Sequence, residues 1–473
     1  MNPYIASRHW ADFITIMDYV LLPFFLMVVY AIAYRFRNKH YPHRHPWRKY
    51  FIPAFTAKLA GGIFIGLIYQ YYYRGGDTSA FFYHAKVINQ SFGDSIITWF
   101  KLIFHTAHYQ DPEVYQYINQ MRWYRDPSSY TVSAITAVIN LLTFNTYLPS
   151  TVIFAALSFT GYWALFRTFA VQYPRLTSSI AVAFLFIPST IIWGSGIFKD
   201  TICMTALGWM THYTFKMLIQ KRIALKPILV ILICSYFLAM IKVYILLVFL
   251  PSLFVWVFNT YSHKIKKGPV RALAVVVSIA LVGGGFFYFS SSFSQQLGAY
   301  SLDNLAETST QTREYILWVS QENDGSGYDL GPIEPTLAGM LSKFPQAVNV
   351  TLFRPYLWEA KKPIVFLNAL EALLCLFFTI KVIVNVGLRG MWKCILTNPN
   401  VQFFLLFTLV FAFAVGISSY NFGTLSRYRI PCLPFYAASL LVMYYSKVNE
   451  RKPFFTLKLK DSIKSPPRRT QYA

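Results

Sequence analysis

The chain has 473 residues, of which 55% are hydrophobic and only 13% charged, a balance that excludes a soluble protein of this size. Its formal net charge is +24, and in a membrane protein such an excess indicates cytoplasmic loops and contact with anionic lipid. We therefore predict an all-α polytopic membrane protein whose partners include membrane lipid and no nucleic acid.

Apolar windows long enough to cross a bilayer, about 20 residues each, occur along most of the chain. They predict about eleven transmembrane helices, at 12–34, 51–71, 147–168, 177–194, 201–219, 227–241, 243–259, 271–290, 364–385, 402–419 and 430–446. The apolar run from Pro227 to Phe258 is divided into two short helices with a turn near Lys242. A single helix would place the basic residues of 264–271 outside.

Basic residues decide the predicted orientation. The segment 35–49 follows the first span and contains six Lys and Arg residues and no acidic one, which is typical of a cytoplasmic loop. The N-terminus is therefore expected outside and the C-terminus in the cytoplasm, with 447–473 as a basic, disordered tail. We expect an integral protein of a bacterial inner membrane.

The predicted organisation has five parts, two of which contain large external loops. They are 1–50 with an extra helix and a basic loop, 51–290 with seven core helices and external loop 72–146, external loop 291–363, 364–446 with three helices, and tail 447–473. In the first loop, Ser95–Phe104 and Tyr130–Phe144 carry apolar residues on one side. This pattern predicts helices that lie in the membrane interface.

The segment Arg74–His84 carries the strongest local signal, where the second span leaves the membrane on the external side. Its paired glycines, Gly75 and Gly76, permit a sharp turn and a close approach of backbone to ligand. They present Asp77 as a base or a metal ligand. The alternative is that Asp77 only caps a helix starting at Thr78, but the glycines and the aromatic residues favour a functional role.

Other charged residues lie beside predicted spans on the external side. They are Lys199 and Asp200 between the fourth and fifth spans, Lys242 in the hairpin turn, Arg354 and Glu359 before the ninth span, and Arg427 and Arg429 before the eleventh. External arginines beside spans are uncommon, and their planar fork suits phosphate. The alternatives are snorkelling, pairing with Glu359 and contact with lipid headgroups. Glu371 is a further ionisable residue, inside the ninth span.

From the second span onward, the layout is one helix, a long external loop opened by Asp77, six helices, a second long external loop and further helices. This layout, over roughly residues 51–363, resembles the GT-C superfamily of integral membrane glycosyltransferases, which use polyprenyl-phosphate or polyprenyl-diphosphate sugar donors. The resemblance places an essential aspartate at Asp77, and Asp200 falls where further acidic ligands occur in the oligosaccharyltransferases. Asp77 has no second acidic neighbour here, and the first span is additional.

The resemblance implies that Asp77 deprotonates the acceptor hydroxyl at the external face. It also implies a phosphate site formed by the three arginines with Lys199 or Lys242. The predicted substrate-binding set comprises Lys199, Asp200, Lys242, Arg354, Glu359, Arg427, Arg429, Tyr83 and His84. The sequence predicts no definite cofactor; if a divalent cation such as Mg or Mn takes part, Asp77 and Asp200 are its candidate ligands.

Two other functions remain open from the sequence. One is a polysaccharide polymerase or ligase, similar to the O-antigen polymerases, in which external arginines rather than Asp77 lead catalysis. The other is a transporter or lipid flippase, which predicts charges along a path through the membrane and repeated halves with broken helices. The sequence contains no internal repeat, and it leaves the sugar, the acceptor and the oligomeric state open.

Overall fold

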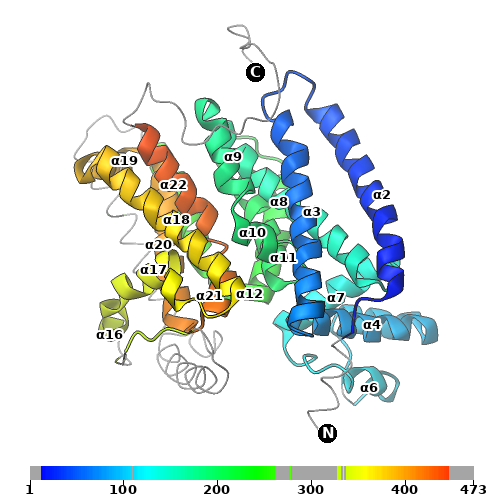
Figure 1. Ribbon diagram of the computed structural model, residues 1–473. Coiled ribbons are helices and arrows are strands. Elements are labelled where there is room, and N and C mark those ends of the chain that lie inside the picture. The colour runs from blue at the N-terminus through cyan, green and yellow to red at the C-terminus, as the bar shows by residue number, and fades with distance from the viewer. Residues whose placement is uncertain are drawn as a thin grey trace.

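The computed structural model describes residues 12–108, 110–262, 277, 327–331, 334 and 337–446. In these ranges the chain is helical, with one isolated bridge between Gly327 and Asn421. Long helices form a bundle, and shorter helices lie across its lower end in Figure 1. The predicted span 271–290 apart from residue 277, most of the loop 291–363 and the tail 447–473 lie outside the described residues.

Six helices of the described residues are long and apolar enough to cross a membrane, which confirms the predicted class of protein. They are α2 (Ile16–His40), α3 (Arg48–Leu67) with its π-helical extension Ile68–Tyr72, α8 (Tyr147–Ala170), α12 (Leu225–Ser262), α18 (Pro363–Val386) and α20 (Pro399–Ser418). Each begins and ends within a few residues of a predicted span or, for α12, of the predicted pair of spans.

The predicted span 177–194 is divided in the structure. It forms α9 (Thr177–Leu185) and α10 (Pro188–Trp193), with Ile187 extended at φ −73° and ψ 124°. Pro188 explains the break, because proline disfavours helical backbone at the residue before it and lacks the N–H that would continue the helix. The predicted span 201–219 corresponds to α11 (Lys199–Thr214) with its π-helical continuation Phe215–Ile219, and the predicted span 430–446 corresponds to the shorter helix α22 (Leu433–Ser446).

The chain turns back at Lys242, as the sequence predicts. Lys242 has non-helical φ and ψ of −148° and 77° in the middle of α12. The Tyr261 hydroxyl near the end of α12 donates to the carbonyl of Leu218, only seven residues before Leu225 in the sequence. A straight helix of 38 residues would be about 57 Å long and would separate these groups. The two halves therefore form a hairpin.

The predicted external loop 72–146 forms four helices. They are α4 (Asp77–Asp94), α5 (Ile96–Ile103), α6 (Pro112–Ile118) and α7 (Pro127–Leu142). The helices predicted at Ser95–Phe104 and Tyr130–Phe144 correspond to α5 and α7, and α4 lies across the end of α3 (Figure 1). These helices share their own apolar core, which includes Ile88, Leu102 and Val114.

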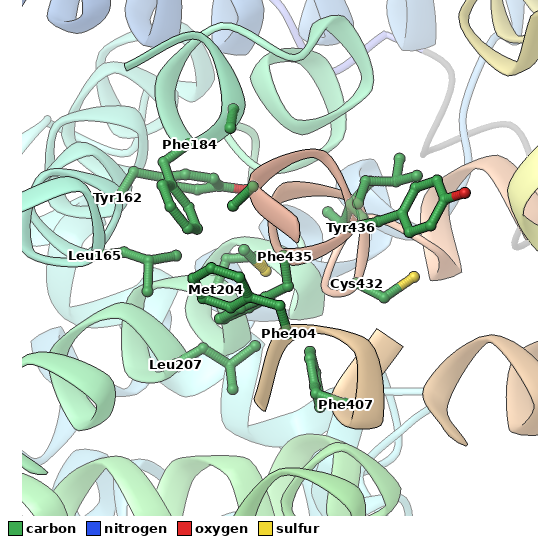
Figure 2. Packing of buried hydrophobic residues seen from close by; sticks show 14 of the residues in the cluster. Tyr162, Leu165, Phe184, Met204, Leu207, Phe404, Phe407, Cys432, Phe435 and Tyr436 are labelled. Atoms are coloured by element: carbon green, nitrogen blue, oxygen red, sulfur yellow. The ribbon is translucent and has the colours of Figure 1, made fainter. Parts of the chain in front are cut away.

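The C-terminal half contributes several shorter helices around α18 and α20. They are α16 (Leu337–Ser342), α17 (Phe344–Phe353), α19 (Leu388–Thr397) and α21 (Phe422–Tyr428). An aromatic core joins this half to the first half, with Phe184 of α9 close to Phe404 of α20 and Phe435 of α22 (Figure 2). The rings of Phe404 and Phe435 lie 5.9 Å apart. Arg427 of α21 contacts Asp200 at the beginning of α11, where charged residues gather.

Candidate functional site

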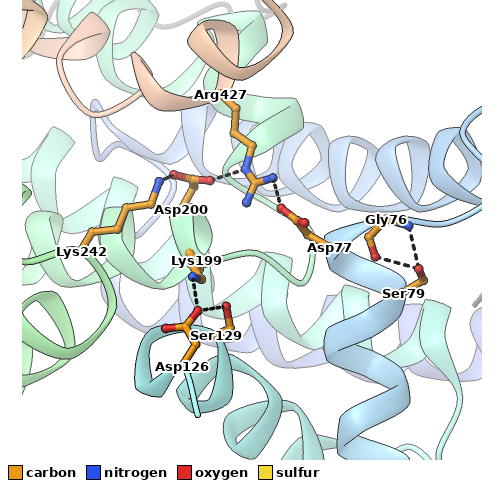
Figure 3. A network of polar contacts seen from close by, with 9 residues as sticks. All are labelled: Gly76, Asp77, Ser79, Asp126, Ser129, Lys199, Asp200, Lys242 and Arg427. Atoms are coloured by element: carbon orange, nitrogen blue, oxygen red, sulfur yellow. Dashed lines mark hydrogen bonds and ion pairs between the residues drawn. The ribbon is translucent and has the colours of Figure 1, made fainter. Parts of the chain in front are cut away.

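Four charged side chains from distant parts of the sequence form a continuous chain at one end of the bundle (Figure 3). The Arg427 guanidinium donates from Nη1 to Asp77 Oδ2 and from Nε to Asp200 Oδ2, each at 2.7 Å. The ammonium of Lys242 donates to the other oxygen of Asp200. Acidic and basic groups therefore alternate from Asp77 to Lys242.

Burial differs strongly along this chain. The side chain of Asp200 is 0% exposed and that of Lys242 7%, whereas Arg427 is 12% exposed and Asp77 46%. A buried charge is tolerated only when it is paired, and Asp200 is paired with two cations. Asp77 is the open end of the network, where a substrate can reach a carboxylate.

The turn before α4 explains how Asp77 reaches Arg427. Gly75 and Gly76 have φ of 123° and 141°, a region that favours glycine. A Cβ on Gly76 would lie 2.6 Å from the ring of Tyr69. The Ser79 hydroxyl accepts from the Gly76 N–H at 3.0 Å. Helix α4 begins at Asp77 with Gly76 as its N-cap, and the Asp77 carboxylate bonds to Arg427 instead of capping the helix.

Aromatic rings enclose the cations of the network. The Arg427 guanidinium lies 4.8 Å from the ring centre of Phe198, and the Lys242 ammonium lies 4.4 Å from that of Tyr428. These distances are within the range of cation–π attraction. Phe198 directly precedes Lys199 and Asp200 at the start of α11, and Tyr428 directly follows Arg427 in α21. The same two segments therefore position both the charged groups and the aromatic rings.

A second ion pair lies beside the first network and involves a residue that the sequence analysis missed. Lys199 Nζ is 3.6 Å from Asp126 Oδ2. Asp126 also accepts from the Ser128 N–H and the Ser129 hydroxyl at the start of α7. Burial raises the pKa of Asp126, but the Ser129 hydrogen bond and then Lys199 outweigh it and lower the pKa overall. The Asp126–Pro127 pair is typical of a helix start, and this pattern was the feature of the sequence from which Asp126 could have been identified.

A cavity of about 300 Å³ adjoins Asp77 and Arg427. Its walls combine polar groups with apolar side chains, and it is lined by Tyr69, Tyr73, Asp77, Trp193, Lys362, Ile364, Val365, Asn421, Gly423, Thr424, Arg427 and Tyr428. Lys362, at the start of α18, is a second residue that the sequence analysis did not single out. The cavity provides a carboxylate, a guanidinium and an ammonium around one space.

Two of the predicted arginines lie in separate ion pairs. Arg354 pairs with Glu359, which was the alternative considered for it. Arg429 is 1% exposed, and its Nη2 lies 3.3 Å from Glu371 Oε1. Nη1 also donates to the Arg354 carbonyl at 3.0 Å. These contacts fix the segment before α18 to α21, and Arg429 does not line the cavity beside Asp77.

Tyr83 and His84 lie about two helical turns beyond Asp77 in α4. Tyr83 packs against the apolar core of helices α4 to α7. His84 is buried, and its ring lies 5.5 Å from that of Trp123. The structure therefore brings Asp77, Lys199, Asp200, Lys242 and Arg427 together and places Tyr83 and His84 elsewhere.

The predicted metal ligands, Asp77 and Asp200, do not form a metal site in this arrangement. Arg427 lies between their carboxylates and bonds to both, in the position that a divalent cation would take. No group of three His, Cys, Asp or Glu side chains in the described ranges could hold a metal ion.

The chain matches no protein-family model, and searches of curated proteins and of solved structures find no match. The function must therefore be argued from the chemistry of this site.

Proposed function

We propose that the protein is a membrane glycosyltransferase that transfers a sugar from a polyprenyl-phosphate-linked donor to an acceptor at the external face. The observation that carries the proposal is the cavity in which the half-exposed carboxylate of Asp77 faces the Arg427 guanidinium. A base and a phosphate-binding cation are the two groups that such a transfer needs in one place.

In the proposed reaction, an acceptor hydroxyl attacks the anomeric carbon of the donor sugar. Its proton passes to Asp77, and the bond between the anomeric carbon and the phosphate oxygen breaks. The lipid phosphate leaves with the electron pair, and Arg427 stabilises its negative charge. Asp200 and Lys242 hold Arg427 in position from the buried side.

The proposal includes a topology of about eleven spans, with the N-terminus outside and the basic loops in the cytoplasm. The two short halves of α12 and the pair α9 and α10 would each cross or enter the membrane in this scheme. Asp77, Asp200 and Lys242 would then share the external face, which is a bacterial periplasm if the membrane is a bacterial inner membrane.

The decisive experiment compares Asp77→Asn with the wild-type protein in membranes supplied with a labelled polyprenyl-phosphate sugar. We expect at least about a 100-fold loss of transfer, since asparagine accepts the Arg427 hydrogen bond but cannot take a proton. Glu113→Gln is the matched control, because Glu113 is exposed in α6 of the same loop. Full transfer by a folded Asp77→Asn protein would refute the proposal.

A polysaccharide polymerase or ligase is the second candidate, favoured by the central position of Arg427 between two carboxylates. In such an enzyme the arginine rather than the aspartate leads catalysis. Arg427→Ala would then abolish activity while Asp77→Ala retains most of it, whereas the glycosyltransferase proposal expects a large loss from both variants.

A further inference from the structure

The cations near the site differ in whether a carboxylate already neutralises them. Lys199 faces Asp126, and Lys242 and Arg427 face Asp200. Lys362 lines the cavity beside Asp77, its residue is exposed, and it forms no ion pair with any residue that the structure describes. Lys362 is therefore the cation in the cavity wall that is available for a new anion.

We infer that Lys362 and Arg427 form the subsite for the phosphate of a lipid that lies along the seam between α10 and α18. The glycosyltransferase proposal is needed only to identify this lipid as the sugar donor. The cavity wall carries one more positive than negative charge, with Lys362 and Arg427 against Asp77. Asp200 does not line the cavity, and Lys242 compensates its charge.

Arg427 has donors left for a phosphate. A guanidinium has five N–H groups, and the bonds to Asp77 and Asp200 use two of them. Phosphate oxygens accept well from both guanidinium and ammonium donors. The phosphate would also compete with Asp77 for Arg427, which would leave the carboxylate freer to accept a proton.

The apolar part of the seam identifies the ligand as a lipid rather than free phosphate. Trp193 of α10 and Ile364 and Val365 of α18 form one wall of the cavity. Further along α18, a second cavity of about 300 Å³ is lined mainly by apolar residues of α9, α10, α18 and α22, among them Pro188 and Leu374. Leu374 lies ten residues after Ile364, about 15 Å along the helix. A lipid whose phosphate lies in the first cavity would therefore place its apolar tail in the second cavity.

A larger apolar groove of about 510 Å³ between α7, α8, α11 and α12 is the competing place for a tail. Its external end lies at Thr201, next to Asp200, and it shares no lining residue with the cavity that contains Lys362. The larger groove has its own lysine, Lys226, but this residue lies at the start of α12, at the end of the groove away from Asp200. The seam between α10 and α18 has Lys362 beside Asp77 and Arg427, so we assign the tail to the seam.

The first test measures binding of a fluorescent polyprenyl phosphate to the purified full-length protein in detergent, without any sugar. Lys362→Gln should weaken binding about tenfold or more, because it removes a charge-assisted contact, and Lys362→Arg should retain most of it. Lys361→Gln is the matched control, since Lys361 is an exposed neighbour that does not line the cavity. Unchanged affinity of Lys362→Gln would overturn the inference.

Two further probes distinguish the sources of the phosphate. Uncharged polyprenol should bind at least about tenfold more weakly than polyprenyl phosphate, and inorganic phosphate alone should not compete at equal concentration. Equal binding of polyprenol would rule out a phosphate subsite, and equal competition by inorganic phosphate would rule out a lipid ligand.

The second test fills each apolar site with a bulky side chain. Leu374 and Ile233 are 54% and 53% exposed, and they line the seam cavity and the larger groove respectively. Leu374→Trp should weaken polyprenyl phosphate binding severalfold, whereas Ile233→Trp should not. The reverse result would move the tail to the larger groove. Since no sugar is present, these results stand even if Asp77→Asn retains transfer activity and refutes the proposed function.

Discussion

At the scale of single residues, burial decides how strongly each member of the network around Arg427 stabilises the fold. Asp200 is completely buried between two cations, whereas Asp77 is half exposed. Removing one partner of a buried ion pair costs about 3–5 kcal/mol, because a charge is left uncompensated. We expect Asp200→Asn to lower the thermal unfolding temperature far more than Asp77→Asn.

Thermal unfolding of the purified variants in detergent checks this order. Arg427→Gln should fall between the two aspartate variants, because Asp200 keeps Lys242 as a partner. Equal destabilisation by Asp77→Asn and Asp200→Asn would show that the burial seen here does not set the energetics of the network.

The buried His84 predicts that stability depends on pH. Burial, and then the charge of Arg122, lower the pKa of His84 from 6.5 to about 4. Between these values the unfolded chain binds a proton that the folded chain does not, so stability falls as the pH falls from about 6.5 towards 4. The difference amounts to about 3 kcal/mol. His84→Phe should reduce the fall in unfolding temperature between pH 7 and pH 5, relative to the wild-type protein.

The sequence predicted most residues of the charged network, but it did not show which other charged residues lie outside the site. Asp77 stood out because of the paired glycines before it, and Lys199, Asp200, Lys242 and Arg427 stood out because charge beside an apolar span is costly without a partner. The same argument included the other two arginines, since sequence does not show that carboxylates and backbone carbonyls already bind them. Asp126 and Lys362 were missed because residues at a helix start resemble ordinary caps and loop charges.

At the scale of elements, close helix contacts depend on residues without side chains. A Cβ on Gly161 of α8 would lie 2.5 Å from Thr205 Cα of α11, and one on Gly208 would collide with the carbonyl of Gly161. Small residues at such crossings let helix backbones approach. Gly208→Ala should destabilise the protein by about 1–3 kcal/mol, measured by thermal unfolding.

Gly93 near the end of α4 is the matched control for this substitution. A Cβ there would have no heavy atom within 4 Å, so Gly93→Ala should be neutral or stabilise by up to about 1 kcal/mol. A loss of stability in Gly93→Ala as large as in Gly208→Ala would show that helix contact is not the cause.

Hydropathy predicted the helices well where an apolar composition alone determines their length. The prediction was poorer where local backbone chemistry interrupts a helix. Hydropathy located α2, α3, α8, α18 and α20, and charge placement located the turn at Lys242. Hydropathy did not show that Pro188 interrupts the fourth span, because proline in an apolar run changes hydropathy little while it disrupts helical hydrogen bonds. It also did not predict α19, whose apolar residues lie on one side only.

At the scale of the whole molecule, acidic residues are distributed unevenly between the two ends of the bundle. The connecting segments 35–49, 171–176, 220–226 and 387–398 contain no Asp or Glu. The charged network and the helices of 77–142 lie at the opposite end, where α3 finishes (Figure 1). Segments rich in Lys and Arg remain in the cytoplasm, so the site belongs to the external face in the proposed topology.

Cysteine labelling in intact cells tests this orientation. The five native cysteines give little background, since four are buried and Cys375 is partly buried. Glu113 in α6 and Arg222 before α12 are both exposed, on opposite ends of the bundle. A membrane-impermeant maleimide should label Glu113→Cys in intact cells and Arg222→Cys only after permeabilisation. The opposite pattern would place the network of Asp77 in the cytoplasm, where a donor presented at the external face could not reach it.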